Sequence, residues 1–320
     1  MREHWANPSS LYAPGARSEE ALNAARAAVA RTLGCKSREL YFTSCGSESN
    51  NMALLGAALT RRFGKGIVVS GFEHPSVQKP LERLAAMGYD VTVVDPGPDG
   101  TLDIDRMLDH VDKNTILVAC MMVNNEVGTR NDVERLAAEV KRRNSRTIVH
   151  VDAVQAWMRV PIKLANIDTL AVSGHKIHAP KGIGALYLSD SLYQAFQAPY
   201  LGGEQEREKR PGTENLPYAL GHALAEKYMP NGTCGVLCFG PKGGRDGAMR
   251  FTNGLKMVAI VTHVADARSC VLHPASHTHR QLNDQQLIEA GVLPDLIRLS
   301  VGIEDVNDII ADLDQALANV

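Results

Sequence analysis

A lysine beside an imidazole and a hydroxyl stands out in residues 173–182, which read Ser-Gly-His-Lys-Ile-His-Ala-Pro-Lys-Gly. The apolar run before it, 167–172, predicts a short buried strand. At the end of such a strand Lys176 would lose part of its solvation, which favours formation of a Schiff base by its amine. A single lysine in a Pro/Gly loop is more typical of solvated surface, so this assignment depends on motifs elsewhere in the chain.

Four other polar motifs each follow a predicted strand. Asp152 and Gln155 follow the apolar residues 147–149, and an aspartate that faces a pocket from a strand end can hold a protonated pyridine nitrogen. Small hydroxyl residues and a glycine in 43–50 lie before a predicted helix, a position that suits a phosphate group. The other two motifs are Glu73-His74-Pro75-Ser76 and Val123-Asn124-Asn125-Glu126-Val127-Gly128. A Schiff-base lysine, a carboxylate for a pyridine nitrogen and a turn that suits a phosphate are groups that pyridoxal phosphate requires.

Strand and helix patterns alternate through the first 150 residues. This alternation predicts the α/β class, with a mostly parallel sheet flanked by helices. All the motifs above fall where strands of such a sheet end, which is where ligands bind. After about residue 230 the pattern changes to that of a smaller α+β domain. We therefore expect a cofactor-binding domain over 1–228 and a small C-terminal domain over 229–320.

Composition narrows the functional classes further. The chain has 320 residues, 44% of them hydrophobic, and a formal net charge of −2, which gives no reason to expect nucleic acid or a membrane as a partner. No apolar run approaches membrane-spanning length, and the polar residues 1–4 do not resemble a signal peptide. The six cysteines form no secreted disulfide pattern, so reduced thiols and a cytoplasmic location are expected.

The five motifs, in this order and at about these spacings, resemble a cysteine desulfurase of the class V aminotransferase group. Residues 6–10, 202–207 and 210–215 agree with the same family, so the resemblance covers about residues 4–225. It implies the pyridoxal-phosphate transferase fold of type I and the cofactor pyridoxal 5'-phosphate. It also implies a homodimer, a small amino-acid substrate such as L-cysteine, and a protein that accepts the sulfur.

Roles for single residues follow from the resemblance. Lys176 would be the Schiff-base lysine and the proton shuttle at the substrate α-carbon, and His74 would stack on the cofactor ring and serve in acid–base steps. Asp152 would pair with the pyridine nitrogen, Gln155 with the phenolic oxygen, and Asn125 would lie near that oxygen and the substrate carboxylate. The alternatives are a helix-capping aspartate and a histidine in a turn before proline.

The resemblance also supplies phosphate and carboxylate contacts. The phosphate ligands would be Gly46, Ser47, Ser173 and His175, with Thr213 completing the phosphate site of the neighbouring subunit. Arg298 would clamp the substrate carboxylate, for which the guanidinium fork is suited; the alternative is a surface arginine on an edge strand.

The second half departs from the desulfurase pattern. Residues 243–245, 266–269, 272–279 and 296–305 resemble the C-terminal domain of the cystathionine-synthase and O-acetylhomoserine-sulfhydrylase group. The chain is therefore interpreted as a hybrid joined near 226–233. The N-terminal segment that helps to wall the substrate site in desulfurases, and the N-terminal segment of the second family, are both expected to be missing.

No loop here matches the one that carries the nucleophilic cysteine in desulfurases. Cys234, Cys238 and Cys270 are possible persulfide carriers, although structural thiols are the plainer interpretation. The spacing of Cys270, His273, His277 and His279 fits no common zinc site, so no metal is expected.

Desulfuration of L-cysteine to L-alanine is the favoured reaction. One alternative is a β- or γ-lyase or a sulfhydrylase, which needs no cysteine of its own because the sulfur simply leaves. The other alternative is a scaffold that binds the cofactor but turns over little substrate.

Overall fold

The computed structural model describes residues 4–97, 100–224, 235–262, 268–289 and 292–320. The chain divides into two compact units. The first contains residues 1–95, 103–123 and 131–232, and the second contains 96–102, 124–130 and 233–320. Residues 96–102 and 124–130, from the first half of the chain, thus belong to the second unit. The predicted division into 1–228 and 229–320 does not include this.

A seven-stranded sheet in the order β1-β7-β6-β5-β4-β2-β3 forms the centre of the described part of the first unit. Strands β2 to β6 pair in parallel, and β7 runs antiparallel to both of its neighbours. The strands are β1 (Leu40–Thr43), β2 (Gly66–Ser70), β3 (Asp90–Val94), β4 (Thr115–Met121), β5 (Ile148–Asp152), β6 (Thr169–Ser173) and β7 (Gly184–Leu188). The mostly parallel sheet predicted from the sequence is confirmed.

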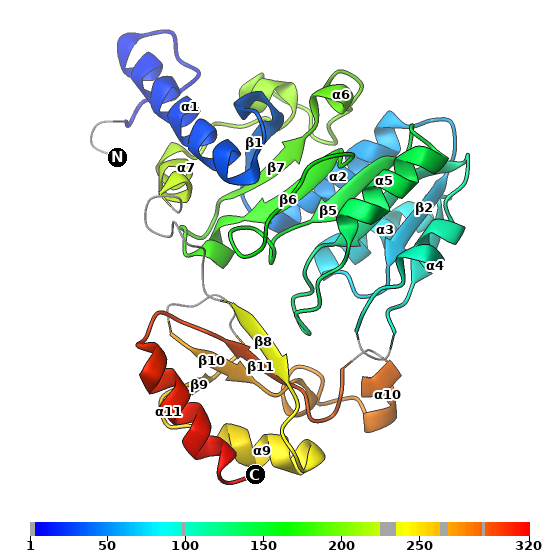
Figure 1. Ribbon diagram of the computed structural model, residues 1–320. Helices are drawn as coiled ribbons and strands as arrows, with labels where there is room; N and C mark the ends of the chain where they lie inside the picture. Colours follow the sequence, from blue (N-terminus) through cyan, green and yellow to red (C-terminus); the bar gives the residue numbers. More distant parts are fainter. Residues whose placement is uncertain (1–3, 98–99, 225–234, 263–267, 290–291) are drawn as a thin grey trace. The chain divides into compact units, whose positions relative to one another are not determined.

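Helices cover both faces of this sheet. From β1 the chain moves across the sheet to β3, and then it turns back to β4 and β5. Because crossovers between parallel strands are right-handed, the helices of these two runs lie on opposite faces. The helices are α1 (Ala13–Leu33), α2 (Gly46–Thr60), α3 (Pro75–Ala86), α4 (Ile104–Asp109), α5 (Val133–Arg143), α6 (Asp190–Tyr193) and α7 (Leu216–Ala223), with short 3-10 turns η1 (Ser37–Glu39), η2 (Gly174–Ile177) and η3 (Gln205–Glu208). Figure 1 shows α2 and α5 on either side of the sheet.

The second unit has a four-stranded sheet in the order β8-β11-β10-β9. Its described elements are β8 (Val236–Phe239), α9 (Gly244–Gly254), β9 (Ala259–Ile260), β10 (Cys270–Leu272), η4 (Pro274–Ser276), α10 (Asp284–Glu289), β11 (Ile297–Ser300) and α11 (Val306–Leu317). Phe251 and Ala316 bring α9 and α11 into one buried cluster with Ile297 and Leu299 of the sheet. This is the small α+β fold expected for the end of the chain.

Most predicted elements are present, and the differences have local causes. The alanine-rich pattern of residues 19–33 predicts a helix that Gly34 ends, whereas α1 begins earlier, at Ala13. A proline is tolerated in its first turn, because the N–H that proline lacks would have no helical partner there. Gly34 caps this helix in the left-handed conformation, as predicted. Strand β7 was not predicted, since its five residues follow a Pro/Gly-rich stretch.

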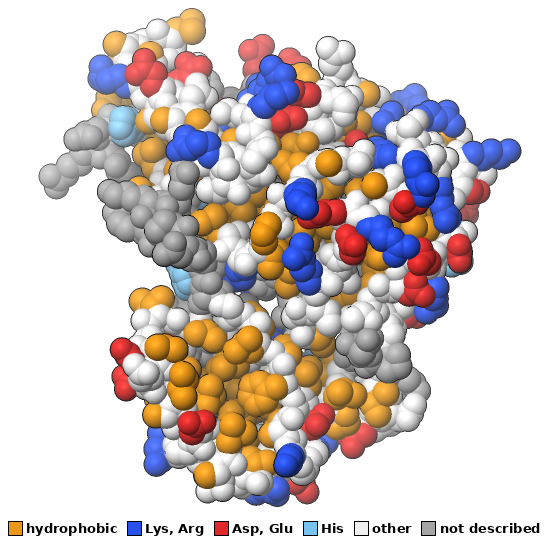
Figure 2. Space-filling view, in the orientation of Figure 1, with side chains coloured by type: hydrophobic (Ala, Val, Ile, Leu, Met, Phe, Trp, Pro, Cys, Tyr) orange, Lys and Arg blue, Asp and Glu red, His pale blue; other side chains and the backbone are white. Residues whose placement is uncertain are grey.

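The surface agrees with the modest net charge. In Figure 2, cationic and anionic side chains are interspersed over the first unit, and apolar side chains gather over the second. None of the helices in the described ranges combines the length and apolarity needed to cross a bilayer.

Candidate active site

The ends of β5 and β6 meet the beginning of α2. A Cβ atom on Gly46, the first residue of α2, would lie 2.7 Å from a methyl of Val154 and 3.3 Å from Cβ of Ser173. Only a glycine allows this approach, which brings the amino end of a 15-residue helix to the carboxyl edge of the sheet. Three of the sequence motifs, those at 43–50, 152–155 and 173–182, therefore meet at this edge of the sheet in the first unit.

Lys176 lies in η2, the turn that directly follows β6. The guanidinium of Arg159 donates to the backbone carbonyl of Lys176 and, at 3.2 Å, to that of Gln155. Arg159 thus links the lysine turn to the turn that follows β5. The Lys176 side chain is neither buried nor fully exposed, so it can be reached from solvent.

Ser173 and His175 contact each other beside this lysine. The hydroxyl of Ser173 is 2.8 Å from Nδ1 of His175. Partial burial, and then the positive charges of Lys176 and Lys181, lower the pKa of His175 to about 4. The imidazole is therefore neutral at pH 7, and a neighbouring anion would favour its charged form.

Asp152 ends β5 with a buried carboxyl group. Its Oδ1 accepts from the backbone N–H of Val154 at 2.9 Å, and its Oδ2 accepts from Nδ2 of Asn50 at 2.8 Å. Burial raises the pKa of Asp152, while these hydrogen bonds and the positive charges of His74 and Lys176 act to lower it. A cationic group beside this carboxylate would stabilise its charged form.

His74 and Ser47 line one open cavity of about 410 Å³. His74 precedes α3, where its Nδ1 accepts from the backbone N–H of Ser76 at 3.1 Å. Its ring is exposed, as is Ser47 in the first turn of α2. The other residues around this cavity include Asn51, Lys79 and Arg83.

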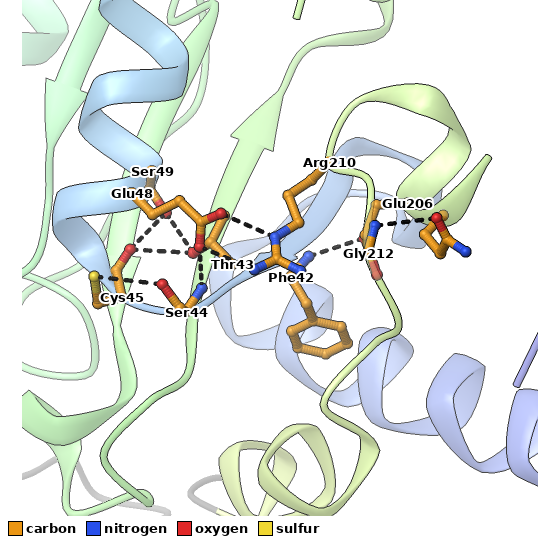
Figure 3. A network of polar contacts seen from close by, with 10 residues as sticks. Phe42, Thr43, Ser44, Cys45, Glu48, Ser49, Glu206, Arg210 and Gly212 are labelled. Carbon is orange, nitrogen blue, oxygen red and sulfur yellow. Dashed lines mark hydrogen bonds and ion pairs between the residues drawn. The ribbon is translucent and has the colours of Figure 1, made fainter. Parts of the chain in front are cut away.

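The loop before α2 is tied to a distant segment of the chain (Figure 3). Glu48 accepts from the backbone N–H of Ser44 and, at 2.9 Å, from Nε of Arg210. Arg210 stands three residues before Thr213, whose side chain is exposed. The Glu48–Arg210 ion pair thus joins the segment that carries Thr213 to the first turn of α2.

Asn125 and Arg298 lie together in the second unit. Arg298 is 4% exposed, and its guanidinium donates to the Asn125 carbonyl at 3.3 Å and to the Glu126 carboxylate at 2.7 Å. Its strand, β11, is internal, because β8 and β10 pair with it on either side. The alternative of a surface arginine on an edge strand is wrong.

The two described thiols of the second unit, those of Cys238 and Cys270, are partly or fully buried. Cys238 stands opposite Arg298 in the β8–β11 ladder and donates to the carbonyl of Glu126 at 3.1 Å. Burial raises the pKa of Cys238 to about 11, so its thiol is protonated at neutral pH. Cys270 is buried in β10, and Cys234 lies outside the described residues.

Comparison with known proteins now places the chain in a family. A family profile described as "Aminotransferase class-V" matches residues 1–233. The chain belongs to the class-V aminotransferase family. A second profile, "Cys/Met metabolism PLP-dependent enzyme", matches residues 209–318.

Individual class-V relatives carry desulfurase names. A cysteine desulfurase of Nostoc sp. is 41% identical over 223 residues, which are 69% of this chain and 55% of that protein. The chain thus spans little more than half the length of the curated relatives it matches. A solved structure titled as a NifS-like protein superposes with a TM-score of 0.77 at 26% identity and covers 99% of this chain and 92% of its own. Another, "SspA in complex with cysteine", has a TM-score of 0.77 at 26% identity, with 96% and 93% covered. The type I fold is therefore confirmed.

Class-V family members use pyridoxal phosphate, and the residues in this site fit that cofactor. Gln155 is 5% exposed, yet one end of its side-chain amide has no partner among the described residues. Such a buried orphan is costly unless a ligand satisfies it. A lysine amine, a buried carboxyl group and a helix that begins with a glycine lie at the same edge of the sheet, which matches an amine-reactive, cationic and phosphorylated group.

Two residues at this class-V site escaped the sequence analysis. Asn50, in α2, forms a side-chain hydrogen bond to Asp152. His150, two residues before Asp152 on β5, forms a second hydrogen bond to Asn50. The available signal was the spacing of His150 and Asp152, since residues i and i+2 of a strand share one face. Asn50 carried no such signal, because its partner lies 100 residues away.

Glu73 is a buried carboxyl group beside the site with an unusual titration. Its Oε1 accepts from Ser70 and from the backbone N–H of Met121, while Oε2 has no partner among the described residues. Burial, and then the charge of Asp152, raise the pKa of Glu73 to about 8. The group is thus protonated in the folded protein at neutral pH.

Replacing Glu73 with glutamine is expected to change how stability depends on pH. The pKa of Glu73 is higher in the folded than in the unfolded protein. Its contribution to the free energy of unfolding is therefore full below about pH 4.5 and is lost as the pH rises to about 8. Glutamine cannot ionise, so the stability of the variant relative to wild type rises over this pH range by an amount on the order of 4 kcal/mol. Urea denaturation of both proteins at pH 5.5 and pH 9 measures this gain. If variant and wild type differed in stability by the same amount at both pH values, Glu73 would be ionised at both.

Proposed function

We propose that this protein is a pyridoxal-phosphate-dependent cysteine desulfurase that converts L-cysteine to L-alanine. The observation that carries the proposal is the gathering of Lys176, Asp152 and Gln155 at the carboxyl edge of one sheet, with an unsatisfied buried amide among them. The desulfurase names of relatives about 40% identical support the same reaction.

The cofactor would be held by residues of three elements. Asp152 would face its ring nitrogen and Gln155 its phenolic oxygen. The phosphate ligands would be Gly46, Ser47, Ser173 and His175, and Thr213 of one subunit would complete the phosphate site of the other. When bound, the cofactor withdraws electrons from the carbon that carries the substrate amino group.

The residues around that carbon would bind substrate and move its protons. The Lys176 amine would hold the cofactor covalently and take the α-proton of the substrate. His74 would stack on the ring and donate or accept a second proton. Asn125 and Arg298 would bind the substrate carboxylate, for which Arg298 must exchange the Glu126 carboxylate for that of the substrate.

A thiolate would then attack the substrate sulfur, so that an S–S bond forms as the Cβ–S bond breaks. Alanine is left, and the sulfur departs on the attacking thiol to an acceptor protein. We infer further that the protein is a cytoplasmic homodimer. We also infer that residues 1–228 form the cofactor-binding domain and 229–320 the small domain, and that these come from different parent families.

A second candidate is elimination or replacement at a sulfur amino acid. The match of residues 209–318 to enzymes of Cys/Met metabolism favours it. So does the state of Cys238 and Cys270, because a protonated or buried thiol is a poor nucleophile. A β-lyase needs no such thiol.

Product analysis separates the candidates. The purified protein loaded with pyridoxal phosphate is incubated with L-cysteine and a reductant, with Cys238→Ala and Cys270→Ala alongside. Alanine and sulfide in equal amounts are expected for desulfuration, and pyruvate with ammonia and sulfide would assign a lyase. Neither product, with the cofactor still bound, would overturn both and leave a binding scaffold. Loss of alanine in one cysteine variant alone would identify the sulfur carrier.

A further inference from the structure

A network of hydrogen-bonded polar side chains connects buried Asp152 to exposed His74. His150 and Asp152 alternate along β5 and therefore project from the same face of the sheet. Helix α2 lies over that face and places Asn50 above both residues. Thr169 is the neighbour of His150 on β6. All four residues are 2% exposed or less, so their polar atoms depend on one another.

The orientation of the Asn50 amide is determined by its neighbours. Its Nδ2 lies 2.8 Å from Oδ2 of Asp152 and 2.9 Å from the hydroxyl of Ser76. The reverse orientation would set the amide oxygen against a carboxylate oxygen, where neither can donate. Asn50 therefore gives both of its protons away, one to Asp152 and one to Ser76.

This orientation fixes the tautomer of His150. The remaining amide atom, Oδ1 of Asn50, is 3.0 Å from Nε2 of His150, which must therefore carry the proton. Nδ1 is 3.0 Å from the hydroxyl of Thr169, which can donate or accept, so this end does not decide the tautomer. Burial lowers the pKa of His150 to about 3, and the ring holds a single proton at neutral pH.

The other branch of the chain reaches His74. Because the Ser76 hydroxyl accepts from Asn50, its own proton is available for Nδ1 of His74, 2.7 Å away. The backbone N–H of Ser76 points to the same nitrogen. Nδ1 of His74 is thus an acceptor, and a neutral His74 carries its proton on Nε2.

We propose that Asn50, oriented by His150, is a positioning residue that supplies a donor to Asp152 and, through Ser76, places the proton of His74 on Nε2. It ties two groups on separate elements, the end of β5 and the start of α3, to one amide. The inference rests on the proposed function only in that Asp152 and His74 face the cofactor.

The first test is independent of turnover. Nitrogen-15 spectra of the histidine-labelled apoprotein at pH 7.5 report the tautomer of each ring, and His150→Gln and His74→Gln assign the two signals. Protonated Nε2 and unprotonated Nδ1 are expected for both histidines. A His150 ring protonated on Nδ1, or on both nitrogens, would overturn the proposal.

The second test measures cofactor affinity by titration with pyridoxal phosphate, followed by visible absorbance. Losing a donor to a buried carboxylate in Asn50→Ala is expected to raise the dissociation constant about tenfold to a hundredfold. The same substitution should alter the His74 signals. His150→Leu should weaken binding similarly, and His150→Gln, which keeps a donor toward Asn50, should restore most of the affinity.

Controls separate positioning from general damage. Asn144→Ala removes another buried asparagine, whose amide contacts backbone carbonyls at the opposite edge of the sheet, and should bind the cofactor as wild type does. Should Asn50→Ala fail to fold, Asn50→Asp keeps the size and replaces the donor by an acceptor. Equal affinities for the Asn50 and Asn144 variants would refute the proposal. Wild type that binds the cofactor but forms no alanine would instead refute the proposed function alone.

Discussion

Replacing Lys176 with alanine is expected to abolish the visible absorbance that the protein gains with pyridoxal phosphate. The amine is the group in this site that can hold the cofactor covalently, and the turn η2 fixes it through the Arg159 contact to its carbonyl. Under the proposed function, formation of alanine should fall by about four orders of magnitude, since proton transfer at the substrate is lost with the amine. Spectra and product assays on the same samples measure both effects.

Lys181 provides the matched control for this substitution. It lies five residues further along the same loop, is exposed, and contributes a similar positive charge near His175. Lys181→Ala should keep the absorbance and the activity. A Lys176→Ala protein with an unchanged visible spectrum would remove the central assignment of this site, whatever its activity.

The sequence predicted the part of the site that local pattern controls. Lys176, Asp152 and Ser173 each stand at the end of an apolar run, and parallel strands carry such positions to one edge of the sheet. The glycine at position 46 was expected near a phosphate, and the structure gives the reason for it, because a Cβ there would meet Val154.

The parts that were not predicted depend on contacts between distant residues. Asn50 and His150 are ordinary polar residues until the fold brings α2 onto β5. The same holds for Glu206 and Arg26, which are 180 residues apart. No sequence periodicity marks either pair, since each forms only when helices pack against strands that are distant in the sequence. Asn125 illustrates a further limit, because its loop is grouped with the small second unit rather than with the motifs beside it in sequence.

Glu206 and Arg26 form a buried ion pair that holds the segment carrying Thr213. The pair is bidentate, with N–O distances of 2.6 and 2.7 Å, and both residues are 5% exposed. Glu206 also accepts from the backbone N–H of Phe42 at 2.9 Å, and Arg26 donates to the Leu40 carbonyl. These bonds connect α1, β1 and η3.

The backbone beside the ion pair, at residues 206–208, is strained. Residues 206–208 all have positive φ angles, of 47, 54 and 63°, although none is glycine. Left-handed backbone costs such residues about 1–2 kcal/mol each. The strained turn persists because the Glu206 carboxylate is fixed by the guanidinium on one side and by the strand on the other.

Glu206→Gln is therefore expected to lower the free energy of unfolding by about 3–5 kcal/mol, because it leaves the Arg26 charge buried without its counter-ion. The double variant Arg26→Met/Glu206→Gln should recover part of this loss, since no unpaired charge remains. Asp190→Asn, which breaks the exposed contacts to Lys36 and Arg38, should leave the urea midpoint close to that of wild type. Urea denaturation of the four proteins tests this order. Equal destabilisation by the single and double variants would show that the hydrogen bonds to the strand, and not the buried charge, hold the segment in place.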